Sequence, residues 1–214
     1  TSLDLSKNTA LTTVTCFDNQ LTSLNVTGCT ALKKFHCYNN QIVSLNFSGC
    51  AVLTDLRCNN NRLTSLVLSS CNKLELLYCE DNQLSSLDLS ESTALQSLKC
   101  GNNQLSSLDV SHCEELILLS CGKNQLASLS VAKNTKLQTL YCYDNSLQGL
   151  DLLQNTVLKT LYIYGNQIHD EAMDNLIESV SSEVSGKLVR ILYSTSDGNV
   201  CTKVQAEALR EKGW

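Results

Sequence analysis

Proline is absent from the 214-residue chain, although an average usage of about 5% would predict roughly ten prolines. Aromatic residues make up only 5% of the chain, with a single tryptophan. Proline has no backbone N–H, so it has no easy place in a fold where nearly every strand and turn N–H is hydrogen-bonded. Its absence is therefore consistent with a regular stack of strands and turns.

Charge is also scarce, since 17% of residues are charged and the net charge is −5. Nucleic acids and acidic membrane surfaces attract strongly basic proteins, and this chain has no basic excess. No apolar run approaches the roughly 18–20 residues that span a bilayer. We therefore expect no nucleic-acid partner and no membrane insertion by this segment.

What the chain has instead is an internal repeat of 21 residues. The unit reads L-x-x-L-x-C-x-x-N-x-L-x-x-L-x-L-S-x-C-x-x, as in LTTVTCFDNQLTSLNVTGCTA. Its ninth position is always Asn, from Asn19 to Asn166, and its eleventh is always Leu or Ile. The eight units begin at Leu11, Leu32, Leu53, Leu74, Leu95, Leu116, Leu137 and Leu158.

Such columns of identical residues are what a solenoid requires, because each coil buries its apolar side only against the coils before and after it. The alternating L-x-C segment has the period of a strand, and such strands would stack in parallel. The asparagine column fits a ladder in which each buried amide bonds the backbone of its own turn and of a neighbouring one. The sequence therefore predicts an elongated parallel β stack.

This pattern resembles the leucine-rich repeat family, whose motif L-x-x-L-x-L-x-x-N-x-L is matched in all eight units, with cysteine usually replacing the third leucine. The short period resembles the bacterial surface type, internalin-like in general character. The resemblance implies a right-handed α/β-type solenoid with a parallel β-sheet on its concave side and short extended or 3₁₀ segments on its convex side. It also implies a non-catalytic module that binds a protein or glycan ligand on the concave face, in an extracellular or cell-surface location.

The return path of each unit contains a column of hydroxyl residues at the seventeenth position. Side chains of this type commonly cap a turn by accepting a backbone N–H. We expect that role for Ser6, Thr27, Ser48, Ser69, Ser90 and Ser111.

The twelve cysteines largely follow the same columns. Seven occupy the sixth position of successive units, from Cys16 to Cys142, and four occupy the nineteenth position. In the last unit the sixth position is Ile163. A metal site would need C-x-x-C or mixed Cys/His clusters, which the sequence lacks. Aligned strands would hold neighbouring Cβ atoms nearer 5 Å apart than the roughly 3.8 Å of a disulfide. We expect buried free thiols and no cofactor, with disulfide bonds and a metal site as the alternatives.

The repeat divides the chain into a solenoid, residues 1–168, and a C-terminal cap, residues 169–214. In the cap, one helix is predicted over 169–184 from the helical spacing of Met173, Leu176, Ile177, Val180 and Val184. The segment KLVRILY (187–193) predicts one more strand of the parallel sheet. A second helix is predicted before Gly213, with Val200, Val204, Ala208 and Leu209 on one face.

The first ten residues form only the second half of a repeat, and they begin at Thr1 without an initiator methionine or a signal peptide. Terminal repeats normally need a polar cap, and this end has none. We therefore expect the natural protein to continue upstream, or its exposed end to be covered.

Six of the seven tyrosines fall in two columns, the fifth and seventh positions. Because positions 4 and 6 point inward, positions 3, 5 and 7 should point outward from the sheet. Tyr141 should then adjoin Tyr162, and Tyr143 should adjoin Tyr164, with Gly101 and Gly122 leaving open floor beside them. The candidate ligand-binding residues in these columns are Tyr141, Tyr143, Tyr162, Tyr164, Tyr78, Tyr38, His36 and Arg57.

Two interpretations of the tyrosines remain open. Tyrosine suits a solvent-facing strand position, where neighbours on adjacent strands pack on each other. Alternatively, tyrosine gives rigid contact area with a polar tip, which is typical of binding hot spots. A binding module is therefore the leading function, and a structural spacer or assembly segment of a longer chain is the alternative.

An enzyme is disfavoured by the residues present. Its best case is an acid/base pair formed by Glu80 and Asp81 near Asp55. An open, shallow sheet cannot desolvate such carboxylates, and the sequence has no legible Ser-His-Asp or Cys-His arrangement. Charged residues of both signs on the sheet are explained by a solvated surface, with a partner whose charges alternate along the groove as the alternative.

Overall fold

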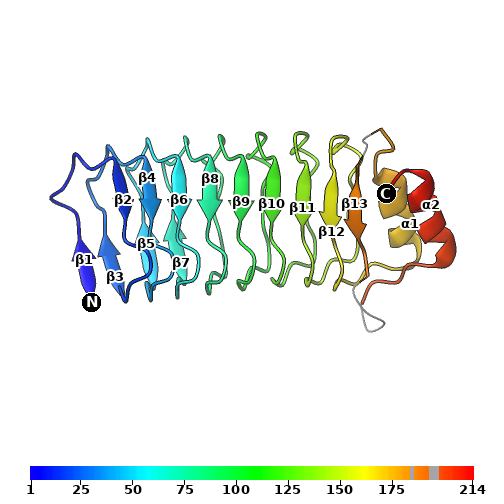
Figure 1. The fold of residues 1–214 in the computed structure, drawn as a ribbon, viewed down its shortest axis with the longest axis horizontal. Helices are drawn as coiled ribbons and strands as arrows, with labels where there is room; N and C mark the ends of the chain where they lie inside the picture. Colours follow the sequence, from blue (N-terminus) through cyan, green and yellow to red (C-terminus); the bar gives the residue numbers. More distant parts are fainter. Residues whose placement is uncertain (184–185, 193–197) are drawn as a thin grey trace.

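The structure is a computed structural model that describes residues 1–183, 186–192 and 198–214. It is an elongated stack of short strands, with β1 at one end and the helices α1 and α2 at the other (Figure 1). The described residues form one nine-stranded parallel sheet that runs along the stack. Its strands, in spatial order, are β13 (Leu188–Arg190), β12 (Thr160–Tyr162), β11 (Thr139–Tyr141), β10 (Leu118–Ser120), β9 (Ser97–Lys99), β8 (Leu76–Tyr78), β6 (Asp55–Arg57), β4 (Lys34–His36) and β2 (Thr13–Thr15).

Strand register follows the repeat. In β11 and β12 the partners are Leu140 with Leu161 and Tyr141 with Tyr162, each 21 residues apart. The predicted parallel stack of repeats is thus confirmed. The predicted extra strand is confirmed as β13, which pairs in parallel with β12 and sets Arg190 beside Tyr162. Tyr193, at the end of that prediction, lies outside the described residues.

The opposite side of the early repeats carries short extended pieces that pair among themselves. These are β1 (Ser2–Asp4) with β3 (Ser23–Asn25) and β5 (Ser44–Asn46) with β7 (Ser65–Val67). Tight turns follow them, closed by backbone bonds such as Cys29 N–H to Val26 O at 3.0 Å. Short extended segments and turns with bonds between residues three apart therefore make the return path, as predicted.

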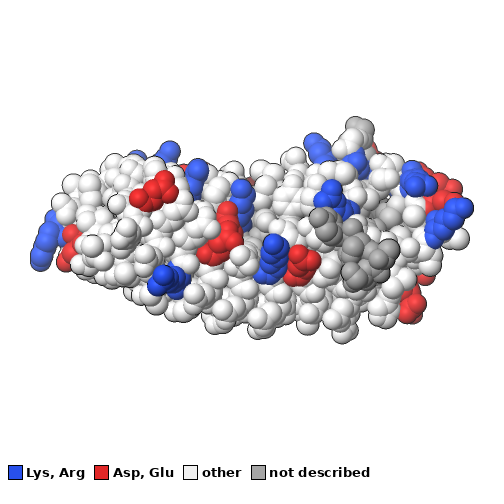
Figure 2. Space-filling view, turned by 60° about the horizontal axis from the view of Figure 1, so that its bottom comes forward, with Lys and Arg blue, Asp and Glu red and all other residues white. Residues whose placement is uncertain are grey.

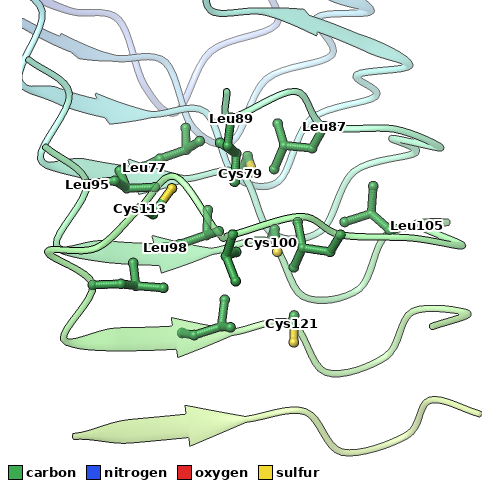
Figure 3. Close-up of a cluster of buried hydrophobic side chains, with 14 of the residues drawn as sticks. Leu77, Cys79, Leu87, Leu89, Leu95, Leu98, Cys100, Leu105, Cys113 and Cys121 are labelled. Atoms are coloured by element: carbon green, nitrogen blue, oxygen red, sulfur yellow. The ribbon is translucent and has the colours of Figure 1, made fainter. Parts of the chain in front are cut away.

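The core lies between the sheet and the return path. Figure 3 shows Leu77 and Leu98 beside the cysteines of successive strands, with Cys79, Cys100 and Cys121 in one row. All twelve cysteines lie in the described residues and are free thiols. Burial raises the pKa of Cys121 to about 12 and that of Cys113 to about 11. The cysteine column therefore packs as small apolar core residues, as predicted.

The asparagine column forms the predicted ladder. Asn103 donates from Nδ2 to the carbonyl oxygens of Cys79 at 3.1 Å and Cys100 at 3.0 Å. Its Oδ1 accepts the backbone N–H of Leu84 at 2.9 Å. Asn199 continues this pattern into the C-terminal part, where Nδ2 donates to the carbonyl oxygen of Ile163. The ladder supplies partners for backbone groups that the curved turns leave without strand partners.

The hydroxyl residues are not the acceptors that cap the return turns. In the turn at Ser90, the backbone N–H of Ser90 donates to Oδ1 of Asp88 at 3.0 Å, which holds the pKa of that carboxyl below its ordinary value. The acceptor is thus an Asp or Asn at the fifteenth position, two residues earlier, in an Asx turn. The same bond is formed by Asp4, Asn25, Asn46, Asp109 and Asp151.

The C-terminal part contains α1 (Asp170–Ser179) and α2 (Lys203–Glu211), which pack on each other. Met173 and Leu176 of α1 and Leu209 of α2 are buried, as the helical spacing predicts. The predicted apolar face of the second helix is wrong at Val204, which is 75% exposed, and at Val200, which precedes the helix and is 52% exposed. Val184 lies outside the described residues.

Candidate binding surface

The outward side of the nine-stranded sheet, here called the sheet face, is formed by positions 3, 5 and 7 of each repeat. These positions alternate with the buried Leu and Cys positions, because successive side chains of a strand point to opposite sides. All eight candidate ligand-binding residues lie on this face, in the strands or two residues after them. They divide into a C-terminal group of four tyrosines and an N-terminal group around Asp55.

The four C-terminal tyrosines touch one another, and together they are called the tyrosine platform: Tyr141, Tyr143, Tyr162 and Tyr164. The ring centroids of Tyr141 and Tyr162 are 4.9 Å apart, and those of Tyr143 and Tyr164 are also 4.9 Å apart, with planes 15° from parallel. The ring centroids of Tyr162 and Tyr164 are 6.4 Å apart. The predicted contacts are therefore confirmed, while the role of these residues in binding stays a prediction.

A guanidinium group extends the platform toward the C-terminal helices. The guanidinium carbon of Arg190 lies 5.0 Å from the ring centroid of Tyr162. This position follows from the pairing of β12 with β13, which aligns the two residues. A cation over a tyrosine face attracts the ring electrostatically and holds both groups in place.

The expectation of open floor at both glycines is wrong at Gly122. An ideal Cβ on Gly122 would lie 2.8 Å from ring carbons Cε1 and Cζ of Tyr143, so the tyrosine ring fills that space. Gly122 is itself buried. The glycine thus makes room for the Tyr143 ring, a contact between positions of adjacent repeats that the column alignment alone does not reveal.

The N-terminal group is organised by a buried carboxylate. Asp55 is 6% exposed; its Oδ2 lies 3.0 Å from Nε2 of His36, and its Oδ1 accepts from Nε of Arg57 at 3.0 Å. Burial raises the pKa of Asp55, but the bonds from Arg57 and His36 outweigh it and leave the pKa below its ordinary value. Asp55 is therefore held as an ion between His36 and Arg57.

Other predicted residues of this group also pack on neighbours. Two cations lie over the ring of Tyr78: the guanidinium carbon of Arg57 is 5.3 Å from the ring centroid, and Nζ of Lys99 is 4.4 Å from it. The ring of Tyr38 stacks on Phe17, with centroids 4.5 Å apart. These contacts agree with the packing interpretation for the N-terminal part of the sheet face.

Between the two groups, the sheet face has a hollow of about 180 Å³, here called the glycine hollow. Glu80 and Tyr143 stand on either side of Gly101, whose own position contributes no side chain. Burial raises the pKa of Glu80, and its Oε2 is shielded from solvent without a hydrogen-bond partner among the described residues. The lining residues are Glu80, Asp81, Lys99, Gly101, Asn102, Ser120, Lys123 and Tyr143.

A larger cavity of about 460 Å³ lies away from the sheet face, between α1 and the return path of the last repeats. Leu153, exposed by 61%, lies at its rim, and Gly149 and Ala172 form a narrow part of its wall. Sequence analysis did not predict this cavity. Its lining combines small residues of the return path and of α1, Gly149 and Ala172, with the polar side chains of Asp151, Asn175 and Glu178.

Charges of both signs are interspersed along the face shown in Figure 2, without a large area of one sign. Within residues 1–183, 186–192 and 198–214, no group of three or more His, Cys, Asp or Glu side chains is arranged to hold a metal ion. In the same ranges, neither helix has the length and apolar character required to cross a membrane.

No protein-family model matches the chain, and no curated protein does. Among solved structures, the chain is similar to the functional domain of InlJ from Listeria monocytogenes, which includes a cysteine ladder. The two are 28% identical, over 90% of this chain and 46% of that one, with a TM-score of 0.64. The shared cysteine ladder adds to the asparagine ladder and the 21-residue repeat described above. This chain is a leucine-rich repeat protein similar to the Listeria internalins.

Two further structures share the leucine-rich repeat fold. Internalin C2 from Listeria monocytogenes is 22% identical, over 88% of this chain and 83% of that one, with a TM-score of 0.66. A leucine-rich repeat protein of Leptospira interrogans is 19% identical, over 97% of this chain and 60% of that one, with a TM-score of 0.77. This leucine-rich repeat chain thus spans about half the length of the InlJ domain and about three fifths of the Leptospira protein.

Proposed function

We propose that the chain is a non-catalytic binding module whose sheet face recognises a protein or glycan ligand, with the tyrosine platform as the anchor. The observation that carries this proposal is the contact of four half-buried tyrosine rings on adjacent repeats. Tyrosine rings give rigid contact area that loses little conformational entropy on binding. A cluster of them at the surface is typical of the centre of a binding interface.

The similarity to the internalins supports a location outside a bacterial cell or on its surface. The repeats also suit an extended ligand, because adjacent strands present equivalent positions at one strand spacing, about 4.8 Å. A ligand lying along the sheet face would then contact the same columns in several repeats. Repetition of this kind gives a solenoid its long binding surface.

A structural spacer is the second candidate. Two observations favour it: the elongated shape in Figure 1, and the contacts of Phe17 with Tyr38 and of Lys99 with Tyr78, which give exposed side chains a packing role. In a spacer, the tyrosine platform would only pack on itself. The two candidates therefore differ in what happens when the platform is removed.

The test compares wild type with a variant in which Tyr141, Tyr143, Tyr162 and Tyr164 are all changed to alanine. Both are applied to arrays of extracellular-matrix proteins, mucins and polysaccharides. A matched control, Leu153→Ser with Val157→Ser, removes exposed apolar side chains that lie outside the sheet face. Circular dichroism and thermal unfolding verify that each protein is folded.

The proposal predicts that the platform variant binds at least about tenfold more weakly than wild type, as expected for loss of a binding hot spot. The control should bind like wild type. Equal binding by all three proteins would place the site elsewhere and overturn the proposal. Binding by none of them would favour the spacer.

A further inference from the structure

The glycine hollow exists because two successive repeats lack a side chain in the seventh column. Gly101 and Gly122 take up that column between Glu80 and Tyr143. The Tyr143 ring lies over Gly122, and the hollow lies beside Gly101, where an ideal Cβ would be 3.0 Å from the backbone oxygen of Gly122. At about 180 Å³ the hollow is smaller than the roughly 300–1,000 Å³ of a drug-sized pocket, so it suits one small unit of a larger ligand.

The walls of the hollow supply three kinds of contact. The Tyr143 ring stacks on Tyr164 on one side and lies over Gly122 on the other, and the ring also lines the hollow. The Glu80 side chain lines the wall and its carboxylate is a hydrogen-bond acceptor, while its Oε2 atom is shielded from solvent. Ser120 and Lys99 carry donors on the wall. An aromatic ring, an acceptor and donors therefore surround one small volume.

We propose that the glycine hollow binds one neutral sugar residue of a glycan ligand. The apolar face of the sugar ring packs on Tyr143, and its hydroxyl groups donate to Glu80 and accept from Lys99 and Ser120. This inference rests on the proposed function, because it assigns the ligand class to one part of the same sheet face. It makes the hollow a specificity site beside the broader tyrosine platform.

Charge in the hollow favours a neutral unit over an ionic one. A lysine or arginine side chain would enter beside Lys99 and Lys123, and a carboxylate would enter beside Glu80 and Asp81. Either charge meets repulsion on one wall. A purely apolar group would cover the polar side chains of Glu80, Lys99 and Ser120 on the wall without offering them hydrogen bonds, which is costly for polar groups that lose their water. A hydroxylated ring can hydrogen-bond both the carboxylate of Glu80 and the donors of Lys99 and Ser120 without adding charge.

Two contacts fix the hollow in the unbound protein. Oδ1 of Asp81 accepts from Nδ2 of Asn102 at 2.6 Å, and Nζ of Lys99 is held over Tyr78 at 4.4 Å. Tyr143 is fixed between Gly122 and Tyr164. Side chains that are already ordered lose less conformational entropy when a ligand binds, so this arrangement favours recognition of a small unit.

The experiment is saturation-transfer difference NMR on the 214-residue chain, with the methyl glycosides of glucose, galactose, mannose, N-acetylglucosamine and N-acetylgalactosamine as probes. Tyr143→Leu removes the aromatic wall and Glu80→Leu removes the acceptor. Tyr38→Leu is the matched control, because Tyr38 occupies the same column but stacks on Phe17, away from the hollow. Tyr143→Phe keeps the ring and removes only the hydroxyl.

At least one glycoside should receive saturation from wild type, Tyr38→Leu and Tyr143→Phe. Its Kd should rise at least about tenfold in Tyr143→Leu and in Glu80→Leu. Absence of transfer to all five glycosides in wild type would overturn the proposal, and so would unchanged transfer in both hollow variants. Thermal unfolding of each variant establishes that a lost signal is not lost folding.

The two proposals fail in different ways. If a protein from the array binds through the tyrosine platform while no glycoside binds wild type, the binding module stands and the sugar assignment is wrong. If that protein ligand is also lost in Glu80→Leu but retained in Tyr38→Leu, the hollow takes a protein side chain, which likewise overturns the sugar assignment.

Discussion

The aromatic ring of Tyr143 fills the space in which a side chain on Gly122 would stand, since an ideal Cβ there would lie 2.8 Å from its ring carbons. Gly122 does not have a left-handed φ, so alanine is allowed by the backbone and acts only through the ring. One methyl group at this position therefore reports on the orientation of the tyrosine platform.

Gly122→Ala is expected to displace the Tyr143 ring and loosen its stacking on Tyr164. The measurement is the near-ultraviolet circular dichroism of tyrosine, together with the affinity for any ligand retained by the array. Gly149→Ala is the matched control, because its ideal Cβ meets only Cβ of Ala172, at 3.9 Å. Identical spectra and affinities for both variants would show that Gly122 has no role in placing the platform.

Asn103→Ala is expected to destabilise the chain by about 3 kcal/mol or more, because a buried amide with four backbone partners is removed. At the exposed start of the ladder, the side-chain amide of Asn19 donates to the carbonyl oxygens of Cys16 and Phe17 in its own turn, so Asn19→Ala should cost about 1 kcal/mol or less. Urea unfolding measures both free energies. Equal losses would contradict a ladder whose strength comes from buried bonds between repeats.

The cysteine column should resist alkylation in the folded chain. Burial raises the pKa of Cys79 and Cys100 far above the ordinary value, so the reactive thiolate is scarce near pH 8. Cys16 and Cys201 are only partly buried and should react first with iodoacetamide. Peptide mass spectrometry of native and urea-unfolded samples gives the order in which the cysteines are alkylated. Labelling of Cys100 as fast as Cys201 in the native chain would refute it.

Asp55→Asn is expected to destabilise the chain at neutral pH and progressively less in acid. The pKa of Asp55 is lowered in the folded state, so its carboxylate stabilises the fold above the unfolded-state pKa. That contribution is lost as pH falls through the folded pKa, which lies below 3.8. Urea midpoints for wild type and variant should therefore converge below this pH, and a constant gap would be inconsistent with the network of His36 and Arg57.

Glu80→Gln provides a control of opposite sign. Burial raises the pKa of Glu80 above 4.5 in the folded state. The protonated Glu80 side chain therefore contributes to folding stability below the unfolded-state pKa, and this contribution is lost as pH rises through the folded pKa. The variant should gain stability relative to wild type as pH rises from 4 toward neutrality, within about the range where Glu titrates. A gap that changes in the same direction as for Asp55→Asn would contradict the assigned environments.

Much of the fold follows from columns that the sequence displays. A period of 21 fixes which residues neighbour each other on adjacent strands, so the contact of Tyr141 with Tyr162 could be predicted before any side chain was placed. The Asx turns could also have been found, because Asp or Asn recurs at the fifteenth position, for example Asp88 and Asp109. The hydroxyl residues at the seventeenth position donate their backbone N–H groups to these Asp and Asn side chains instead of capping the turns themselves.

The remaining features depend on the orientation of individual side chains, which an alignment of the repeats does not reveal. Tyr143 leans over Gly122 and closes floor that the alignment leaves open. Asp55, at the third position, reaches both its own strand at Arg57 and the preceding strand at His36. Val204 lies on the exposed side of α2 because packing against α1, and not helical spacing alone, decides which face is buried.

The most direct test of the central claim is hydroxyl-radical footprinting of the chain with and without a ligand retained by the array. Oxidation of a tyrosine reports the solvent exposure of its ring. The account predicts that ligand lowers the oxidation of Tyr141, Tyr143, Tyr162 and Tyr164, and leaves the oxidation of Leu153 on the return path unchanged. Protection of Leu153 with no change at the four tyrosines would contradict it.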